Sequence, residues 1–141
     1  MLMQTEYDVS KPTFRHIESY WYKYPSLVKE IERIKIYEIM KSPTDENIGG
    51  GRSGYISDPT SAAATRISTH KRLEHIEDIV HAIETVYNMA NEPYRKLVRE
   101  RYWSRDRPDW DILSERIGYS KRQAQRIRKI IIVATAEMLG W

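Results

Sequence analysis

The stretch DWDILSERIGYSKRQAQRIRKII, residues 109–131, decides the fold of the C-terminal part of this chain. The apolar residues of its first part are Ile112, Leu113 and Ile117. Their spacing predicts one short amphipathic helix. Gly118 can adopt the left-handed backbone conformation that ends such a helix, and Ser120 is a typical N-cap for a second one. Two helices at this spacing predict a helix-turn-helix.

The second helix of this stretch is predicted to have one apolar side and one basic side. Apolar residues recur at helical period at Ala124, Ile127, Ile131 and Ala134. No acidic residue occurs from Ser120 to Ala136, although surface helices usually mix both signs to gain ion pairs. The one-signed side therefore predicts an anionic partner, and the alternative is a merely solvated basic helix. Its residues are Lys121, Arg122, Gln123, Gln125, Arg126, Arg128 and Lys129.

The positive charge of the chain is local. Residues 92–141 hold 12 Lys and Arg against 7 Asp and Glu, a net charge of +5, whereas residues 1–91 hold 11 against 13, a net charge of −2. This asymmetry predicts a DNA-binding C-terminal part joined to a protein-binding or oligomerising part. The absence of cysteine suits a reducing cytosol. No apolar run approaches the roughly 20 residues that cross a bilayer, so we expect a cytoplasmic protein without membrane contact.

Nothing in the sequence predicts an enzyme. The chain has no cysteine nucleophile and no paired carboxylates. We therefore expect no catalytic residues, no metal ligands and no cofactor. The segment GGGRSG lacks both a preceding strand and the Lys and Ser/Thr of a phosphate-binding loop. His70, His75 and His81 do not have zinc-ligand spacing, so we interpret them as ordinary surface or core histidines.

We expect an all-α fold in four segments: an N-terminal helical region (residues 1–41), a Gly-rich loop or hinge (42–58), a long central helix (59–91) and a helix-turn-helix DNA-binding domain (92–141). Aromatic residues recur at helical period from Thr13 to Tyr24, a pattern more typical of a core than of a contact surface. Pro25 is expected to end or kink that helix, which predicts an N-terminal helical hairpin.

The central helix carries a heptad-like seam, made by Leu73, Ile76, Val80, Ile83, Tyr87 and Ala90. The seam lasts about two and a half repeats, which is marginal for a coiled coil. Self-association as a homodimer and packing onto the N-terminal helices are almost equally supported. After it, residues 92–103 predict a further helix that packs against the helix-turn-helix, and Trp103 and Trp110 are interpreted as core residues rather than platforms for base stacking.

The order of helices in the last 50 residues resembles region 4 of sigma factors. The whole chain resembles the RinA/ArpU group of phage and prophage late-gene transcription activators, because the segment TDENIGG, residues 44–50, precedes a sigma-like C-terminal domain. That resemblance implies a DNA-binding activator of late genes for packaging, morphogenesis or lysis, which acts with host RNA polymerase at the nucleoid of a bacterial cell. The residues alone predict only binding to double-stranded DNA.

The start of the second helix would then enter the major groove. Arg122 and Gln125 are the candidates for base edges, because Arg pairs with guanine and Gln with adenine. Lys121, Arg126 and Lys129 are the candidates for phosphates. The full predicted DNA-binding set is Ser120, Lys121, Arg122, Gln123, Gln125, Arg126 and Lys129.

Two other functions fit the same helices. A phage small terminase subunit also combines a helix-turn-helix with oligomerising helices, but its DNA-binding domain usually comes first. A sigma-like module that binds polymerase without DNA would not need five basic residues between Lys121 and Lys129.

Overall fold

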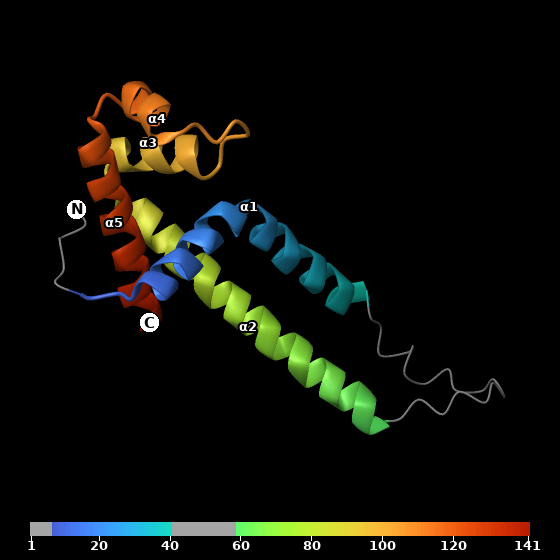
Figure 1. Ribbon diagram of the computed structural model, residues 1–141. Helices are drawn as coiled ribbons and strands as arrows, with labels where there is room; N and C mark the ends of the chain where they lie inside the picture. The colour runs from blue at the N-terminus through green and yellow to red at the C-terminus, as the bar shows by residue number, and fades with distance from the viewer. Residues whose placement is uncertain (1–6, 41–58) are drawn as a thin grey trace. The chain divides into compact units, whose positions relative to one another are not determined.

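The computed structural model describes residues 7–40 and 59–141, and within these residues every regular element is a helix. The helices are α1 (Lys11–Met40), α2 (Pro59–Met89), α3 (Glu92–Arg101), α4 (Trp110–Ile117) and α5 (Lys121–Leu139) (Figure 1). The predicted all-α class is confirmed. The TDENIGG motif and the predicted Gly-rich loop lie outside the described residues. None of the described helices is both long and apolar enough to cross a membrane.

The predicted helical hairpin at the N-terminus is wrong, because Pro25 lies inside one continuous helix, α1. A proline lacks the N–H that would bond to the carbonyl four residues earlier, which here belongs to Trp21. The indole Nε1–H of Trp103 donates a hydrogen bond of 3.0 Å to that carbonyl oxygen. A side chain far along the sequence thus supplies the donor that Pro25 lacks, and the helix continues.

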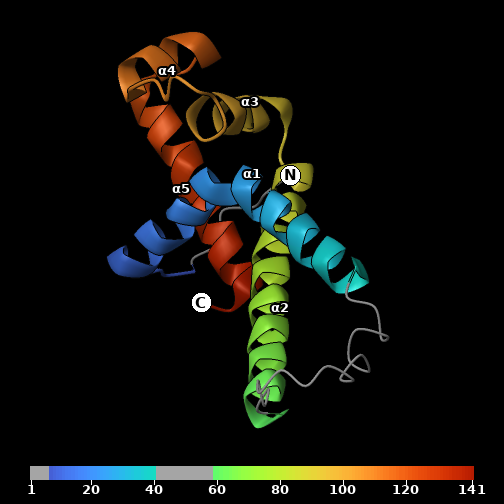
Figure 2. The same ribbon diagram turned by 90° about the vertical axis from the view of Figure 1, so that its right-hand side faces the viewer.

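The chain forms two compact units, whose boundaries fall within α1 and α2: unit 1 comprises Met1–Pro25 and Asp78–Trp141, and unit 2 comprises Ser26–Glu77. Unit 1 therefore adds the first half of α1 and the end of α2 to the residues that were predicted as the DNA-binding domain. Figures 1 and 2 both show the first turns of α1 beside α5. Trp21 is fully buried there, and its Nε1–H donates to Thr135 Oγ1 at 3.1 Å.

Aromatic rings fill much of the core of unit 1. Trp21 and Trp103 stack at 6.2 Å between ring centroids, and Tyr24 stacks on Trp103 at 4.9 Å. In α3, Leu97 and Val98 are buried, as the predicted packing of this helix requires. Trp21 is fully buried, whereas Tyr24 and Trp103 are partly exposed. Their packing therefore joins α1 to the segment that follows α3.

The seam of α2 is largely buried within the single chain. Ile76, Val80, Ile83 and Ala90 are at most 8% exposed. A surface already covered by its own chain is not available to a second copy, so this burial favours the intramolecular alternative over the coiled-coil dimer.

Unit 2 contains the second half of α1 and residues 59–77 of α2. Its small core includes Leu27 and Ile76, and surface ion pairs join its two helices: Arg72 with Glu30 at 2.6 Å and Lys35 with Glu77 at 3.5 Å. Exposed pairs of this kind contribute little stability. Several apolar side chains of the unit are exposed, namely Ile36, Tyr37, Ile39, Met40 and Ile67.

Candidate nucleic-acid interface

Local capping explains why α4 is short and where it ends. Asp109 is its N-cap and accepts a hydrogen bond of 2.9 Å from the backbone N–H of Ile112. At the other end Gly118 has φ of 75°, a backbone conformation that residues with a Cβ rarely adopt. The N–H of Gly118 donates to the carbonyl of Ser114. The predicted stop at Gly118 is confirmed, and α4 contacts both α3 and α5.

A capping box starts α5 two residues later. Ser120 Oγ accepts from the backbone N–H of Gln123 at 3.2 Å, and Gln123 Oε1 accepts from the backbone N–H of Ser120 at 2.9 Å. Two residues of the predicted DNA-binding set thus hold the start of the helix with their side-chain oxygens. Their remaining polar atoms stay on an exposed surface.

The apolar side of α5 is wider than the predicted stripe. Ala124, Ile127 and Ile131 are buried as expected, whereas Ala134 is partly exposed. The additional buried residues are Ile132, Val133, Thr135 and Ala136. Sequence periodicity predicts one covered side, but the second half of α5 is covered from more directions because α1 packs there as well.

Arg122, Arg126 and Lys129 form the open cationic row of α5. They are four and three residues apart, so they lie on the same side of the helix, and all three are exposed. Within the described residues, none of the three has a carboxylate partner. Lys121, by contrast, lies 3.5 Å from Asp111 in an exposed ion pair. Like charges repel one another at this spacing, and an anion on this side would relieve the repulsion.

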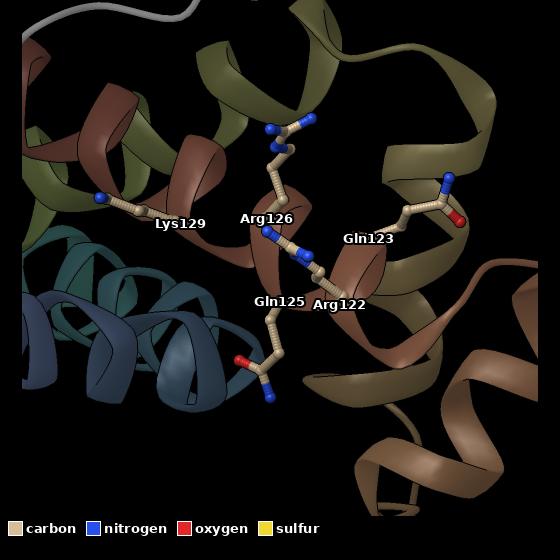
Figure 3. Close-up of a pocket in the computed structure, with 5 residues that line it drawn as sticks. All are labelled: Arg122, Gln123, Gln125, Arg126 and Lys129. Atoms are coloured by element: carbon tan, nitrogen blue, oxygen red, sulfur yellow. The ribbon is translucent and has the colours of Figure 1, made fainter.

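A surface pocket lies along this row (Figure 3). In the figure, Gln125 and Arg126 extend to opposite sides of the helix. The structure therefore brings together five of the seven predicted DNA-binding residues, while Ser120 and Lys121 are outside the pocket lining. The lining residues are Arg122, Gln123, Gln125, Arg126 and Lys129.

Arg128 departs from the predicted basic side, because its charge is compensated within the chain. Its Nε and Nη2 donate to the two carboxylate oxygens of Glu18 in α1, the second at 2.6 Å. The guanidinium also lies 5.0 Å from the ring centroid of Phe14 and 5.5 Å from that of Trp110. The expectation that an external anion balances the whole basic side is therefore wrong for Arg128.

The ion pair between Glu18 and Arg128 is partly buried, with side-chain exposures of 13% and 28%. Burial raises the pKa of the Glu18 carboxyl, but hydrogen bonds from Arg128 and Tyr102 outweigh burial and place this pKa below its ordinary value. The hydrogen bond to Glu18 raises the pKa of Arg128. Both groups are thus charged at neutral pH, and the carboxylate belongs to the structure of the site.

The sequence contained a signal for this contact. Arg128 lies four residues after Ala124 and three before Ile131, so it borders the apolar stripe rather than the open row. A cation at the edge of a core requires an anionic partner from the element that covers the core. The identity of that partner, Glu18, could not be read from residues 110 positions away.

No group of three or more His, Asp or Glu side chains in the described residues is arranged to hold a metal ion. Of the two alternatives left open for His70, His75 and His81, surface or core, the structure shows the first, because all three are exposed. The chemistry that the open cationic row offers is thus electrostatic attraction and hydrogen-bond donation toward an anion.

Residues 10–136 match the family described as "Protein of unknown function (DUF722)". The chain belongs to this family. It is also 30% identical to the "Transcriptional activator rinA" of Staphylococcus phage phi11, in an alignment that covers 99% of each chain. The resemblance to RinA is therefore confirmed at the level of the family. No solved structure matches this DUF722 chain, and the likeness to sigma region 4 stays a prediction.

Proposed function

We propose that this protein is a sequence-specific DNA-binding transcription activator of phage or prophage late genes, which acts with host RNA polymerase in the bacterial cytoplasm. The observation that carries the proposal is the open cationic row of Arg122, Arg126 and Lys129. It follows the turn between α4 and α5, at the position where a helix-turn-helix contacts DNA. A full-length relative named as a phage transcriptional activator supports the same function.

The residues divide by the chemistry of their contacts. Arg122 and Gln125 read base edges, while Lys121, Arg126 and Lys129 hold phosphates. Ser120 and Gln123 fix the start of α5 through their capping box and thereby place the first exposed turn. The backbone amides at such a helix start also favour a phosphate.

The first experiment is the capture of DNA fragments. The purified protein is mixed with pooled fragments of its own replicon at about 150 mM salt, and the retained DNA is sequenced. Retention of one site beside a promoter supports the proposal, and transcription of that fragment by host polymerase should then increase when the protein is added. Retention beside a packaging gene, together with ring-sized particles, would instead favour a small terminase subunit. No enrichment of any fragment would overturn DNA binding.

Two alanine variants test the division between base and phosphate contacts. Gln125→Ala should lose discrimination at one base pair, by about 1–3 kcal/mol. Lys129→Ala should weaken binding to all sequences. It should also reduce the slope of log affinity against log salt concentration by about 1, the value expected for one lost phosphate contact. Lys29→Ala, which removes an exposed lysine of α1, is the matched control. Equal losses for both variants on specific and random duplexes would refute the assignment.

A single helix-turn-helix buries little DNA surface, so a homodimer would add specificity. Since the seam of α2 is largely buried in its own chain, we propose that any dimer uses another surface. Native mass spectrometry at low micromolar concentration measures the oligomeric state directly. A monomer both with and without operator DNA would exclude the dimer.

A further inference from the structure

A chain of hydrogen bonds runs from α1 to the exposed side of α5. Glu18 accepts two bonds from Arg128, and a third, of 2.8 Å, from the hydroxyl of Tyr102. The guanidinium is therefore fixed by a carboxylate along one edge, while the rings of Phe14 and Trp110 lie near it. A side chain held in this way has one orientation and presents its remaining N–H donors in fixed directions.

One of these remaining donors meets Gln125. Arg128 Nη1 donates to Gln125 Oε1 at 3.2 Å. Because a guanidinium has donors only, the amide atom that faces it must be the oxygen. The contact therefore fixes the orientation of the Gln125 amide, with Oε1 toward Arg128 and the Nε2–H donors pointing away from it.

Gln125 is the member of the predicted DNA-binding set whose side chain is bonded to this partly buried ion pair. The amide of Gln123 is bonded instead to the backbone of Ser120. Arg122 and Arg126 have no hydrogen bond or ion pair within the described residues that would fix their side chains. Of the two candidates for base edges, Gln125 thus has an amide orientation that the fold determines before DNA arrives.

We propose that Glu18 is a positioning residue for DNA recognition, which acts through Arg128 to hold Gln125 with its Nε2–H donors toward the major groove. The inference rests on the proposed DNA-binding function. Arg128 occupies one of the two acceptor directions of the amide oxygen, so the fixed amide still offers one acceptor and its Nε2–H donors to a base. This is the bidentate pattern that fits adenine.

The test compares Glu18→Gln with Glu84→Gln, the same chemical change at an α2 residue that accepts from Tyr24 and lies off the DNA-binding side. Binding is measured on the captured site with each base pair varied in turn. Glu18→Gln should lose about fivefold or more of its discrimination at one base pair, where adenine is preferred, and leave the other positions unchanged. Glu84→Gln should leave all positions unchanged.

The double variant Glu18→Gln with Gln125→Ala separates positioning from a merely structural role. If Glu18 acts through Gln125, the double variant should discriminate no less than Gln125→Ala alone. A uniform loss of affinity on every sequence, or a further loss in the double variant, would overturn the proposal.

A measurement without DNA keeps the inference separate from the proposed function. Nuclear magnetic resonance of the free protein records the Arg128 guanidinium, and Gln125→Ala should shift that signal because it removes an acceptor from a partly exposed position. In a folded Glu18→Gln variant, the Gln125 amide signals should shift as well. Unchanged Arg128 signals in Gln125→Ala would overturn the positioning role even if the protein binds DNA, and a shift without DNA binding would contradict the proposed function alone.

Discussion

Two sides of α5 each carry at least one basic residue, yet the surroundings of these residues differ. On the closed side, which we define by Arg128 and Thr135, α1 supplies a carboxylate to the first and an indole donor to the second. On the open side, the cationic row of Arg122, Arg126 and Lys129 has no carboxylate partner in the described part of the chain. The comparison teaches that a basic residue contributes to stability or remains available for a ligand according to what the neighbouring helix places opposite it.

The largest expected effect comes from removing a buried aromatic ring on the closed side. Trp21→Ala deletes a fully buried ring together with its bond to Thr135, and we expect a loss of about 3–5 kcal/mol in the free energy of unfolding. Chemical denaturation followed by circular dichroism measures it. Arg126→Ala on the open side should change stability by no more than about 0.5 kcal/mol. Similar losses of unfolding free energy in the two variants would contradict the distinction between the closed and the open side.

The second prediction exchanges one arginine on each side for methionine, which keeps most of the side-chain length. Arg128→Met leaves the Glu18 carboxylate partly buried without its ion pair, and it should cost about 2–3 kcal/mol after allowance for partial exposure. Arg126→Met should leave the thermal midpoint nearly unchanged and weaken DNA binding. If Arg126→Met destabilised the fold as much as Arg128→Met, Arg126 would have to be paired within the chain, and it would not be available to a ligand.

The third prediction concerns the carbonyl of Trp21 beside Pro25. Trp103→Phe keeps an aromatic ring but removes the indole donor, and it should cost about 1–2 kcal/mol by leaving that carbonyl without a partner. Pro25→Ala restores a backbone N–H at the position from which helices bond to this carbonyl. In a double-mutant cycle of unfolding free energies, Trp103→Phe should therefore cost less in the Pro25→Ala background than in the wild type. Additive effects would contradict the role of Trp103 as the donor that replaces the missing N–H of Pro25.

The smallest expected effect is the pH dependence of the Glu18 carboxylate. Because its folded pKa is depressed below the ordinary 4.5, its stabilisation is present above that value and is lost as pH falls through the folded pKa. The difference in unfolding free energy between wild type and Glu18→Gln should thus shrink below about pH 4.5. Glu84→Gln serves as the reference. A difference that is constant down to strongly acid pH would exclude this contribution.

The sequence predicted the local features of the fold well, because caps and helical period depend on neighbouring residues. Gly118 ends α4 and Ser120 starts α5 as their residue types indicate. The exposed row from Arg122 to Lys129 was also predictable, since spacing alone places these residues on one side. Their role on DNA stays a prediction.

Features that depend on distant partners were missed. Pro25 was expected to end or kink the N-terminal helix, and the hydrogen bond from Trp103 was not predictable from neighbouring residues. Arg128 was grouped with the basic side of α5, because nothing near it in sequence indicates that Glu18 pairs with it. In both cases the deciding atom lies more than 75 residues away. Periodicity carries no information on contacts of that range.

The bond between Trp21 and Thr135 spans 114 residues and so has a consequence for synthesis of the chain. The first half of α1 is made before α5, when its apolar side and the carbonyl of Trp21 have no partner. The residues that cover them follow only much later in the chain. Contacts of such long range also close slowly, since loop closure must precede any gain from the packing. Until α5 is made, the first half of α1 is therefore a segment without the core that it packs against in the finished unit.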